Sequence, residues 1–466
     1  MKKNFLLWLL FVPYLLSAQL RLPAMVSSGM VMQQNEITAL HGWGGPGSQV
    51  FVTTSWNNKT DSAKVSNFGK WSLMVQTPAA GGPYSIKIRN ERSEVLLSNI
   101  MIGELWVCSG QSNMEWSYRQ GLKDIINELP VAYNSSIRLF HIPKTGSSSP
   151  QEDVRGSWMI CDSVSLKDFS AVGYFFGKQL QQQLQVPVGL IDASWGGTPA
   201  ETWVPAGLIE NNATLKIAAA KLQQFDWWPS TPGAAYNGMI NALTGYKIAG
   251  AIWYQGESNV GTNGSYAELM RTLIDSWRGA WKKDFKFYLV QIAPYEYGNS
   301  LDAALLREAQ HEVSNYPGTA MISIPDLVDN IKDIHPVNKR DVGLRLANLA
   351  LGDHYGKLKS GFRNPVISGV QKNKNKLLLT FDHASSGISI HGKKITGLFI
   401  SGPDESWVEA EAKIEKDVLV VWNKKVKNPE YVRYGFGNTT IGNLFSGNGL
   451  PVAPFRNDHW NQIKSN

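Results

Sequence analysis

The chain has 466 residues, of which 43% are hydrophobic and 18% are charged, and its formal net charge is +7. This length exceeds one ordinary hydrophobic core, so two or three domains are expected. The basic residues are scattered, apart from short lysine groups at 372–376 and 424–427, and no nucleic-acid motif is present. We therefore expect no nucleic-acid partner.

Residues 1–18 have the pattern of a cleaved signal peptide. Met-Lys-Lys is followed by a mostly apolar run from Asn4 to Leu16, and small residues stand at Ser17 and Ala18. The apolar run is short for a membrane span. We therefore expect a bacterial protein that is secreted or periplasmic, with no membrane span.

Residues 19–98 have the pattern of a small antiparallel β-rich module. Period-two alternation over 84–89 predicts a strand, and shorter apolar runs at 50–52 and 71–75 predict two more. Clusters of Gly and Pro between these runs predict turns.

Residues 99–356 change to a pattern in which strands and helices alternate. Apolar runs predict buried strands at 100–108, 188–193, 249–254, 285–292 and 319–324. Apolar residues at helical spacing predict helices around 175–184, 266–281, 303–315 and 342–351. This alternation is typical of an α/β fold whose mostly parallel sheet is covered on both faces, with ligands bound beyond the carboxyl ends of the strands.

Residues 357–466 return to a β-rich pattern. Expected strands lie at 376–381, 387–390 and 418–422. No internal repeat or low-complexity tract is visible in the chain.

The chain has two cysteines, Cys108 and Cys161. An oxidising compartment would permit a disulfide between them, and the sequence leaves open whether they pair. Cys108 ends an apolar strand and is expected to be a small buried side chain. No Cys/His cluster has the spacing of zinc ligands. Neither a metal nor another cofactor is expected.

Four polar motifs follow strands or occupy a late loop of the α/β region. They are Gly110–Asn113, Ser194–Trp203, Trp253–Asn259 and Asp333–Pro336. Because the carboxyl ends of parallel strands meet at one edge of a sheet, these motifs are expected to line one crevice. The crevice would hold a hydroxyl, backbone N–H donors, side-chain amides and an imidazole with a carboxylate.

These residue types favour nucleophilic catalysis by a serine. Ser112 is the expected nucleophile, and His335 would take its proton and return it to the leaving alcohol. Asp333 is the expected carboxylate that orients the imidazole. A second interpretation of Asp333 is that it caps the helix that follows Pro336.

The developing oxyanion needs fixed hydrogen-bond donors. The expected donors are the N–H groups of Ser112 and Gly197 and the side-chain amide of Gln255. Gln255 could instead satisfy buried backbone groups. Gly196 and Asn259 are reserve donors. The residues expected to bind substrate are Gln111, Asn113, Gly196, Glu257 and Asn259.

The motifs resemble those of the SGNH hydrolase superfamily and, within it, the sialate O-acetylesterase family. Gly103–Met114 looks like that family's nucleophile block, and Gly449–Arg456 is similar to its C-terminal signature. The resemblance covers most of the chain. It implies a flavodoxin-like, three-layer α/β/α catalytic domain with flanking N- and C-terminal β-rich regions. It also implies metal-free hydrolysis of O-acetyl esters on a sugar or glycan substrate, with an acyl-serine intermediate.

Two departures from the superfamily pattern leave alternatives open. Many SGNH enzymes place an acid three residues before the histidine, where this chain has Lys332. Asp326 and Asp329 are therefore rivals of Asp333, and a Ser–His dyad is a further alternative. The third motif reads Gln-Gly-Glu-Ser-Asn instead of Gly-x-Asn-Asp, so the side-chain oxyanion donor is open as well.

Other functions also stay open at this point. One is an acetyl-xylan or other glycan acetylesterase on the same fold, and another is a non-catalytic carbohydrate-binding protein that uses the abundant Trp residues. A lipase or thioesterase is a third alternative. The sequence identifies neither the acetylated sugar nor the oligomeric state.

Overall fold

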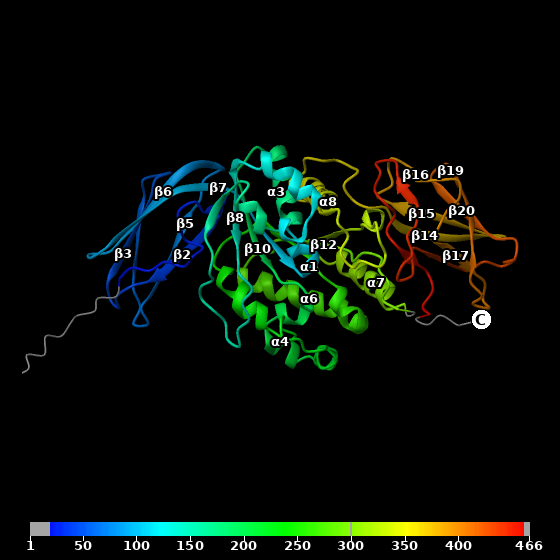
Figure 1. Cartoon of the computed structure of the whole chain (residues 1–466), viewed down its shortest axis with the longest axis horizontal. Coiled ribbons are helices and arrows are strands. Elements are labelled where there is room, and N and C mark those ends of the chain that lie inside the picture. Colours follow the sequence, from blue (N-terminus) through cyan, green and yellow to red (C-terminus); the bar gives the residue numbers. More distant parts are fainter. Residues whose placement is uncertain (1–18, 299–300, 461–466) are drawn as a thin grey trace, which may run out of the picture.

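The structure is a computed structural model that describes residues 19–298 and 301–460. The predicted signal peptide, residues 1–18, lies outside the described residues. Figure 1 shows β sheets toward both ends of the molecule and a layered α/β region between them. The predicted fold class is confirmed, because a central, mostly parallel sheet with helices is flanked by β-rich regions.

The central sheet runs in the strand order β13-β12-β11-β7-β10-β8-β9. Every neighbouring pair along this path is parallel except β8 and β9. The bounds of these strands are β7 (Glu94–Gly110), β8 (Asn134–His141), β9 (Trp158–Cys161), β10 (Val188–Ser194), β11 (Gly250–Tyr254), β12 (Lys286–Val290) and β13 (Thr319–Ile322).

Helices cover both faces of this sheet, with α3 and α8 on one face and α6 and α7 on the other (Figure 1). Side chains alternate along β7, so that Trp106 and Cys108 join the core under α3 and α8 while Leu105 and Val107 join the opposite core. Among the described residues, no helix combines the length and hydropathy needed to span a membrane. The helices are α1 (Ser112–Glu115), α2 (Lys123–Glu128), α3 (Ala171–Leu184), α4 (Ala206–Glu210), α5 (Ala213–Ala219), α6 (Asn263–Trp281), α7 (Asp302–Ser314) and α8 (Lys339–Asp353).

The N-terminal strands form two groups, one of which continues into the central sheet; all their pairs are antiparallel except that of β1 with β7, which is parallel. β2 pairs with β5, whereas β3 pairs with β4 and β6, and β6 pairs with β7. Their bounds are β1 (Val31–Gln33), β2 (Ile37–Trp43), β3 (Gln49–Thr54), β4 (Thr60–Lys64), β5 (Lys70–Gln76) and β6 (Gly81–Arg89).

β7 belongs to both the N-terminal β-rich region and the central α/β region. Its first half pairs with β6, and its second half pairs with β10 and β11. The predicted boundary between residues 98 and 99 therefore falls inside one continuous strand. The division of the chain into domains stays a prediction.

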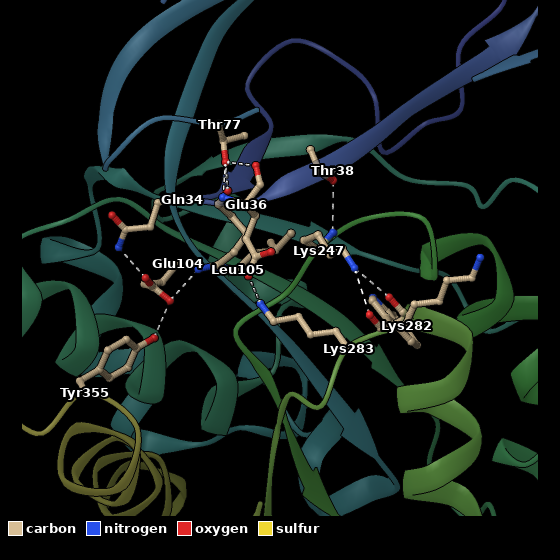
Figure 2. Close-up of polar contacts among 12 residues, drawn as sticks. Gln34, Glu36, Thr38, Thr77, Glu104, Leu105, Lys247, Lys282, Lys283 and Tyr355 are labelled. Atoms are coloured by element: carbon tan, nitrogen blue, oxygen red, sulfur yellow. Dashed lines mark hydrogen bonds and ion pairs between the residues drawn. The ribbon is translucent and has the colours of Figure 1, made fainter. Parts of the chain in front are cut away.

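Polar contacts fix the N-terminal region to the central sheet, as Figure 2 shows. The buried Glu104 carboxylate accepts hydrogen bonds from Gln33 Nε2 at 3.0 Å, Gln34 Nε2 at 2.6 Å and Tyr355 OH at 2.8 Å. An ion pair between Lys283 and Glu36 lies nearby. A buried carboxylate with three donors is well satisfied, so Glu104 joins β7 to segments before it and after α8.

The C-terminal strands form small antiparallel sheets around a separate hydrophobic core. Arg456 contacts Glu308 of α7, which connects this region to the α/β layer. The strands are β14 (Val366–Asn373), β15 (Lys376–Asp382), β16 (Ile388–Ile390), β17 (Leu398–Ser401), β18 (Val408–Glu409), β19 (Glu411–Glu415), β20 (Val418–Trp422), β21 (Tyr431–Tyr434), β22 (Leu444–Ser446) and β23 (Phe455–Arg456).

Candidate active site

Ser112 is the first residue of α1, immediately beyond the carboxyl end of β7. The turn depends on Gly110, whose φ is +134° and where an added Cβ would lie 2.2 Å from the Tyr254 carbonyl oxygen. The Gln111 N–H donates to the same carbonyl at 3.0 Å. The strand therefore stops abruptly, and Ser112 lines a surface cavity.

His335 is the side chain that meets this serine. Its Nε2 lies 2.9 Å from Ser112 Oγ, and its Nδ1 lies 3.5 Å from Asp333 Oδ1. The Trp116 ring stacks on the imidazole with centroids 4.3 Å apart and planes 20° apart. Burial, and then the positive charge of Lys339, hold the pKa of His335 below its usual value, although Asp333 opposes this shift.

Asp333 lies beside His335 but is loosely held. Its carboxylate is 47% exposed, and its Oδ1 also accepts the His335 backbone N–H at 2.9 Å. Asp333 does not cap the following helix, because α8 is capped by Asn338, whose side chain accepts from the Asp341 N–H. The contact with Nδ1 is thus a partly solvated one.

The rival carboxylates lie elsewhere. The Asp326 carboxylate forms a two-pronged ion pair with Arg345, in which Nη1 lies 2.8 Å from Oδ1. Over residues 19–298 and 301–460, no hydrogen bond or ion pair joins Asp329 to His335. Asp333 is therefore the carboxylate that the fold brings to the imidazole.

The Gly196-Gly197 turn closes on the serine. A Cβ added to Gly196 would lie 3.3 Å from the Ser112 Cβ, and Gly197 has a φ of +81°. The Gly196 N–H donates to the Glu115 carboxylate. Within the described chain, the N–H groups of Ser112 and Gly197 have no protein acceptor, and both residues line the cavity. Two amide donors are thus free at the serine.

The structure does not bring Gln255 to Ser112, although the sequence analysis expected its amide there. Gln255 is fully buried, and its Nε2 donates to Asn259 Oδ1 at 2.8 Å and to the Thr198 carbonyl at 3.3 Å. The reserve candidate Asn259 is also buried and donates to Glu201 at 2.8 Å. Both amides are used in joining the loops behind the Gly-Gly turn, so neither is free for an oxyanion.

The other predicted candidates surround the serine turn. Gln111 lines the cavity, and its Oε1 accepts the N–H groups of Gly256 at 3.3 Å and Ser258 at 3.4 Å. Asn113 is fully buried and donates to Glu257 Oε1 at 2.6 Å. Glu257 lines the cavity, and burial raises the pKa of its carboxyl group.

The cavity has a volume of about 510 Å³, and four of the side chains that line it are tryptophans. Trp195 donates from Nε1 to the Trp227 carbonyl at 3.3 Å, and Trp227 is 67% exposed. Trp228 packs so closely on Gly197 that an added Cβ there would lie 2.3 Å from its ring. No sequence pattern pointed to Trp227 and Trp228, because the segment that carries them has neither strand nor helix periodicity.

A charged pair also borders the cavity. Lys144 Nζ lies 2.6 Å from Glu115 Oε1, and the same glutamate holds the Gly196 N–H. No sequence pattern predicted this pair, because Lys144 follows β8 and Glu115 ends α1, and only the tertiary fold brings them together.

Cys108 and Cys161 are both buried free thiols and do not form a disulfide. Burial raises the pKa of each thiol, so neither is readily ionised. In the described part of the chain, no group of three or more His, Cys, Asp and Glu side chains is placed to bind a metal ion.

Known proteins resemble this chain over much of its length. Residues 102–351 match the model of the family described as "Carbohydrate esterase, sialic acid-specific acetylesterase". Sialate O-acetylesterase from Pongo abelii is 28% identical over 400 residues, which cover 78% of this chain and 76% of the relative. The Homo sapiens sialate O-acetylesterase is 27% identical, with the same coverage of both chains.

A solved structure extends the likeness to the flanking regions. The crystal structure of a carbohydrate acetylesterase from Xanthomonas citri is 32% identical, with a TM-score of 0.86, and the match covers 95% of this chain and 100% of that one. Fold, site and comparisons together define a carboxylic ester hydrolase. More particularly, the chain belongs to the sialic acid-specific acetylesterase family of carbohydrate esterases, enzymes that hydrolyse O-acetyl esters of carbohydrates.

Proposed function

We propose that this enzyme removes acetyl groups from a sugar through an acyl-serine intermediate, with Ser112 as nucleophile. The observation that carries the proposal is the 2.9 Å contact between Ser112 Oγ and His335 Nε2. For Nε2 to accept the hydroxyl proton, the ring proton must sit on Nδ1, where Asp333 stabilises it. Asp333 therefore selects the tautomer that can act as a base.

The reaction has two halves. Ser112 Oγ attacks the acetyl carbon while His335 takes its proton; the bond from that carbon to the sugar oxygen then breaks, and His335 returns the proton to that oxygen. A water molecule next attacks the acetyl-serine with the same histidine as base. This step releases acetate and restores the serine hydroxyl.

The oxyanion of each tetrahedral intermediate is held by backbone donors in this proposal. The free N–H groups of Ser112 and Gly197 both border the cavity, which supports this role. Loss of one such donor typically costs about 3–4 kcal/mol in the transition state. Gly196 contributes differently, because its N–H is bound by Glu115 and so orients the turn.

The proposed substrate is an O-acetylated sugar or glycan. The aromatic wall of Trp195, Trp227 and Trp228 supports this choice, since indole rings pack well on the apolar faces of sugar rings. Its relatives are named for sialate and for carbohydrate in general, so O-acetylated sialic acid and acetylated neutral glycans are both candidates. Gln111 and Glu257, which line the cavity beside the serine, are proposed to contact the sugar.

The decisive experiment replaces the two central residues. Ser112→Ala and His335→Ala are each expected to lower turnover of p-nitrophenyl acetate by about 10³-fold or more. Mass spectrometry of the wild-type enzyme quenched during turnover should detect an acetyl group on the peptide that contains Ser112. Near-normal turnover by Ser112→Ala would refute the proposal.

A panel of substrates identifies the sugar. Acetate release should be measured from O-acetylated sialic acid, acetyl-xylan and acetylated monosaccharides, with Ser112→Ala as the blank. The preferred sugar is the substrate with the highest kcat/KM. Tight glycan binding without acetate release from any of them would favour a carbohydrate-binding protein instead.

We also propose that the enzyme is exported from a bacterial cell to the periplasm or the medium. The support is the lysine pair, apolar run and small residues of the first eighteen positions. N-terminal sequencing of the mature protein is expected to begin after Ala18. Recovery of Met1 on exported protein would contradict this cleavage.

A further inference from the structure

A buried lysine lies behind the serine turn. Lys339, the first residue of α8, is 1% exposed, and its Nζ donates to Asn113 Oδ1 at 2.5 Å. The ammonium also lies 5.4 Å from the Trp116 ring centroid and 5.5 Å from that of Tyr254. Burying an ammonium is unfavourable unless it is paired, so a lysine at this position needs a reason.

Asn113 connects this lysine to the loops of the site. Its Oδ1 accepts from Lys339, while its Nδ2 donates to Glu257 Oε1 at 2.6 Å and to the Ile334 carbonyl at 3.0 Å. One side chain thus joins α1, α8, the loop after β11 and the loop that holds His335. Asn113 directly follows Ser112, so any movement of this amide changes where the serine hydroxyl points.

We propose that Lys339 is a positioning residue for the esterase reaction, which holds the Ser112 turn through Asn113 against the loops that carry His335 and Glu257. The inference rests on the proposed roles of Ser112 and His335. Lys339 does not line the cavity, so it acts on the reacting groups without touching substrate. Trp116 strengthens the arrangement, because its ring contacts both the lysine ammonium and the histidine.

The lysine charge has a second effect, on the histidine. The carboxylates that face Lys339 are Glu257, Asp333 and Asp329, but burial outweighs them and lowers the pKa of Lys339 to about 7. The positive charge in turn lowers the pKa of His335, in addition to the effect of burial. Removal of this charge therefore makes the imidazole easier to protonate. As the pH is lowered, the variant should lose activity at a higher pH than the wild-type enzyme does.

The test is Lys339→Met, which keeps the length of the side chain and removes both the charge and the hydrogen bond. On p-nitrophenyl acetate, kcat is expected to fall roughly ten- to hundredfold, because a small misplacement of reacting groups is costly. KM should change little. The acid limb of the kcat/KM profile should move to higher pH, which a purely structural role would not cause.

Lys332→Met is the matched control. Lys332 also lies close to His335 in sequence, but it is exposed and contacts neither Asn113 nor Ser112 in the described structure. Its removal should change kcat by less than about twofold, since an exposed charge is well screened. Lys339→Met with kcat and acid limb equal to those of Lys332→Met would overturn the inference. If Ser112→Ala stayed active, the proposed function itself would fail instead.

A measurement on the unmutated chain covers the case in which Lys339→Met does not fold. Lysine side-chain NMR can follow each ammonium group with pH, with Lys339 assigned by comparison with Lys339→Arg. The protons of the Lys339 ammonium should exchange slowly with water, because the ammonium is buried and bound by Asn113, and its titration should lie below the usual value of 10.5 because burial lowers its pKa. A Lys339 ammonium signal that exchanges its protons with water as fast as the exposed Lys332 would overturn the inference, because the ammonium would then be solvated instead of held by Asn113.

Discussion

Two histidine–carboxylate pairs stand at the same edge of the central sheet, and they differ in instructive ways. His141 ends β8, and its Nδ1 lies 3.1 Å from Asp192 Oδ2 on β10, whose side chain is 1% exposed. His335 lies in a loop, 3.5 Å from an Asp333 carboxylate that is 47% exposed. Judged by the carboxylate contact alone, His141 has the better partner.

The difference shows what a general base requires. The hydrogen bond with Asp192 raises the pKa of His141, whereas burial and Lys339 lower the pKa of His335. A base must be unprotonated before it can accept a proton, so the looser pair is the more suitable one at neutral pH. His335 also reaches a serine hydroxyl, while the nearby Ser194 hydroxyl donates to Asp192 at 2.5 Å instead of to a histidine.

The largest expected difference is between the two histidines themselves. His335→Ala should lower kcat on p-nitrophenyl acetate by about 10³-fold, because it removes the proposed base. His141→Ala should change kcat by less than about threefold, since His141 does not line the cavity. Steady-state kinetics of the two variants checks this prediction. Equal losses of kcat would contradict His335 as the base.

Substitution of Asp333 should mainly lower activity, whereas substitution of Asp192 should mainly lower stability. Asp333→Asn is expected to lower kcat by roughly ten- to hundredfold, less than the histidine variant, because a partly solvated contact orients the ring weakly. Asp192→Asn should leave kcat nearly unchanged but destabilise the fold by about 1–3 kcal/mol, since a buried hydrogen-bonded carboxylate is lost.

Thermal melts and kinetics on both aspartate variants make this test. A variant Asp326→Asn is the control for the rival acid, whose carboxylate is bound by Arg345. A larger loss of kcat in Asp326→Asn than in Asp333→Asn would contradict the assignment of the carboxylate.

The two histidines should affect different properties as the pH changes. Activity, which depends on His335, should rise with pH, whereas the stability that His141 contributes should fall. kcat/KM should rise with pH through a midpoint below 6.5, because the pKa of His335 is lowered and the neutral ring is the active form. The pKa of His141 is raised in the folded state. Its contribution to the free energy of unfolding is therefore complete at acid pH and is lost as the pH rises through this raised pKa. His141→Ala should therefore lower Tm more at pH 5.5 than at pH 8.5. A midpoint above 6.5 for kcat/KM would count against His335 as the base.

The smallest expected effect concerns Glu115, which lies between the two histidine sites. Glu115→Gln keeps an acceptor for the Gly196 N–H but loses the ion pair with Lys144. We expect kcat to fall about two- to fivefold, since a partly exposed ion pair contributes little. Glu115→Ala, which also frees the Gly196 N–H, should lose more activity. Equal rates for the two variants would show that the carboxylate does not orient the turn.

Much of the fold could be predicted from the sequence because the strong patterns are local. Apolar runs predicted β7, β10, β11, β12 and β13, and helical spacing predicted α3, α6, α7 and α8, each of which begins slightly before its predicted range. β8 was missed because its first three residues are polar and resemble a turn. Its pairing with β10 comes from tertiary contacts that no local pattern encodes.

The site was predicted in part for the same reason. The motifs placed Ser112, Gly197 and His335 at strand ends or in a late loop, and the fold brings them together. The carboxylate that lies beside His335 depends on distances across a loop; sequence spacing favoured Asp333, which the fold places there, but did not exclude its rivals. Gln255 was misjudged because an amide beside a motif can equally satisfy buried neighbours, and only the packing of Asn259 and Tyr266 shows that it does.

β7 gives the molecule a mechanical property. β7, which ends at Gly110 two residues before Ser112, begins among the N-terminal sheets; its first half is hydrogen-bonded to β6 and its second half to β10 and β11. Opening of the N-terminal sheet would therefore pull on the backbone of the turn that carries Ser112. Amide hydrogens along Glu94–Gly110 should exchange as one slow cooperative unit, and a truncation before residue 94 should loosen the serine without removing any residue of its site.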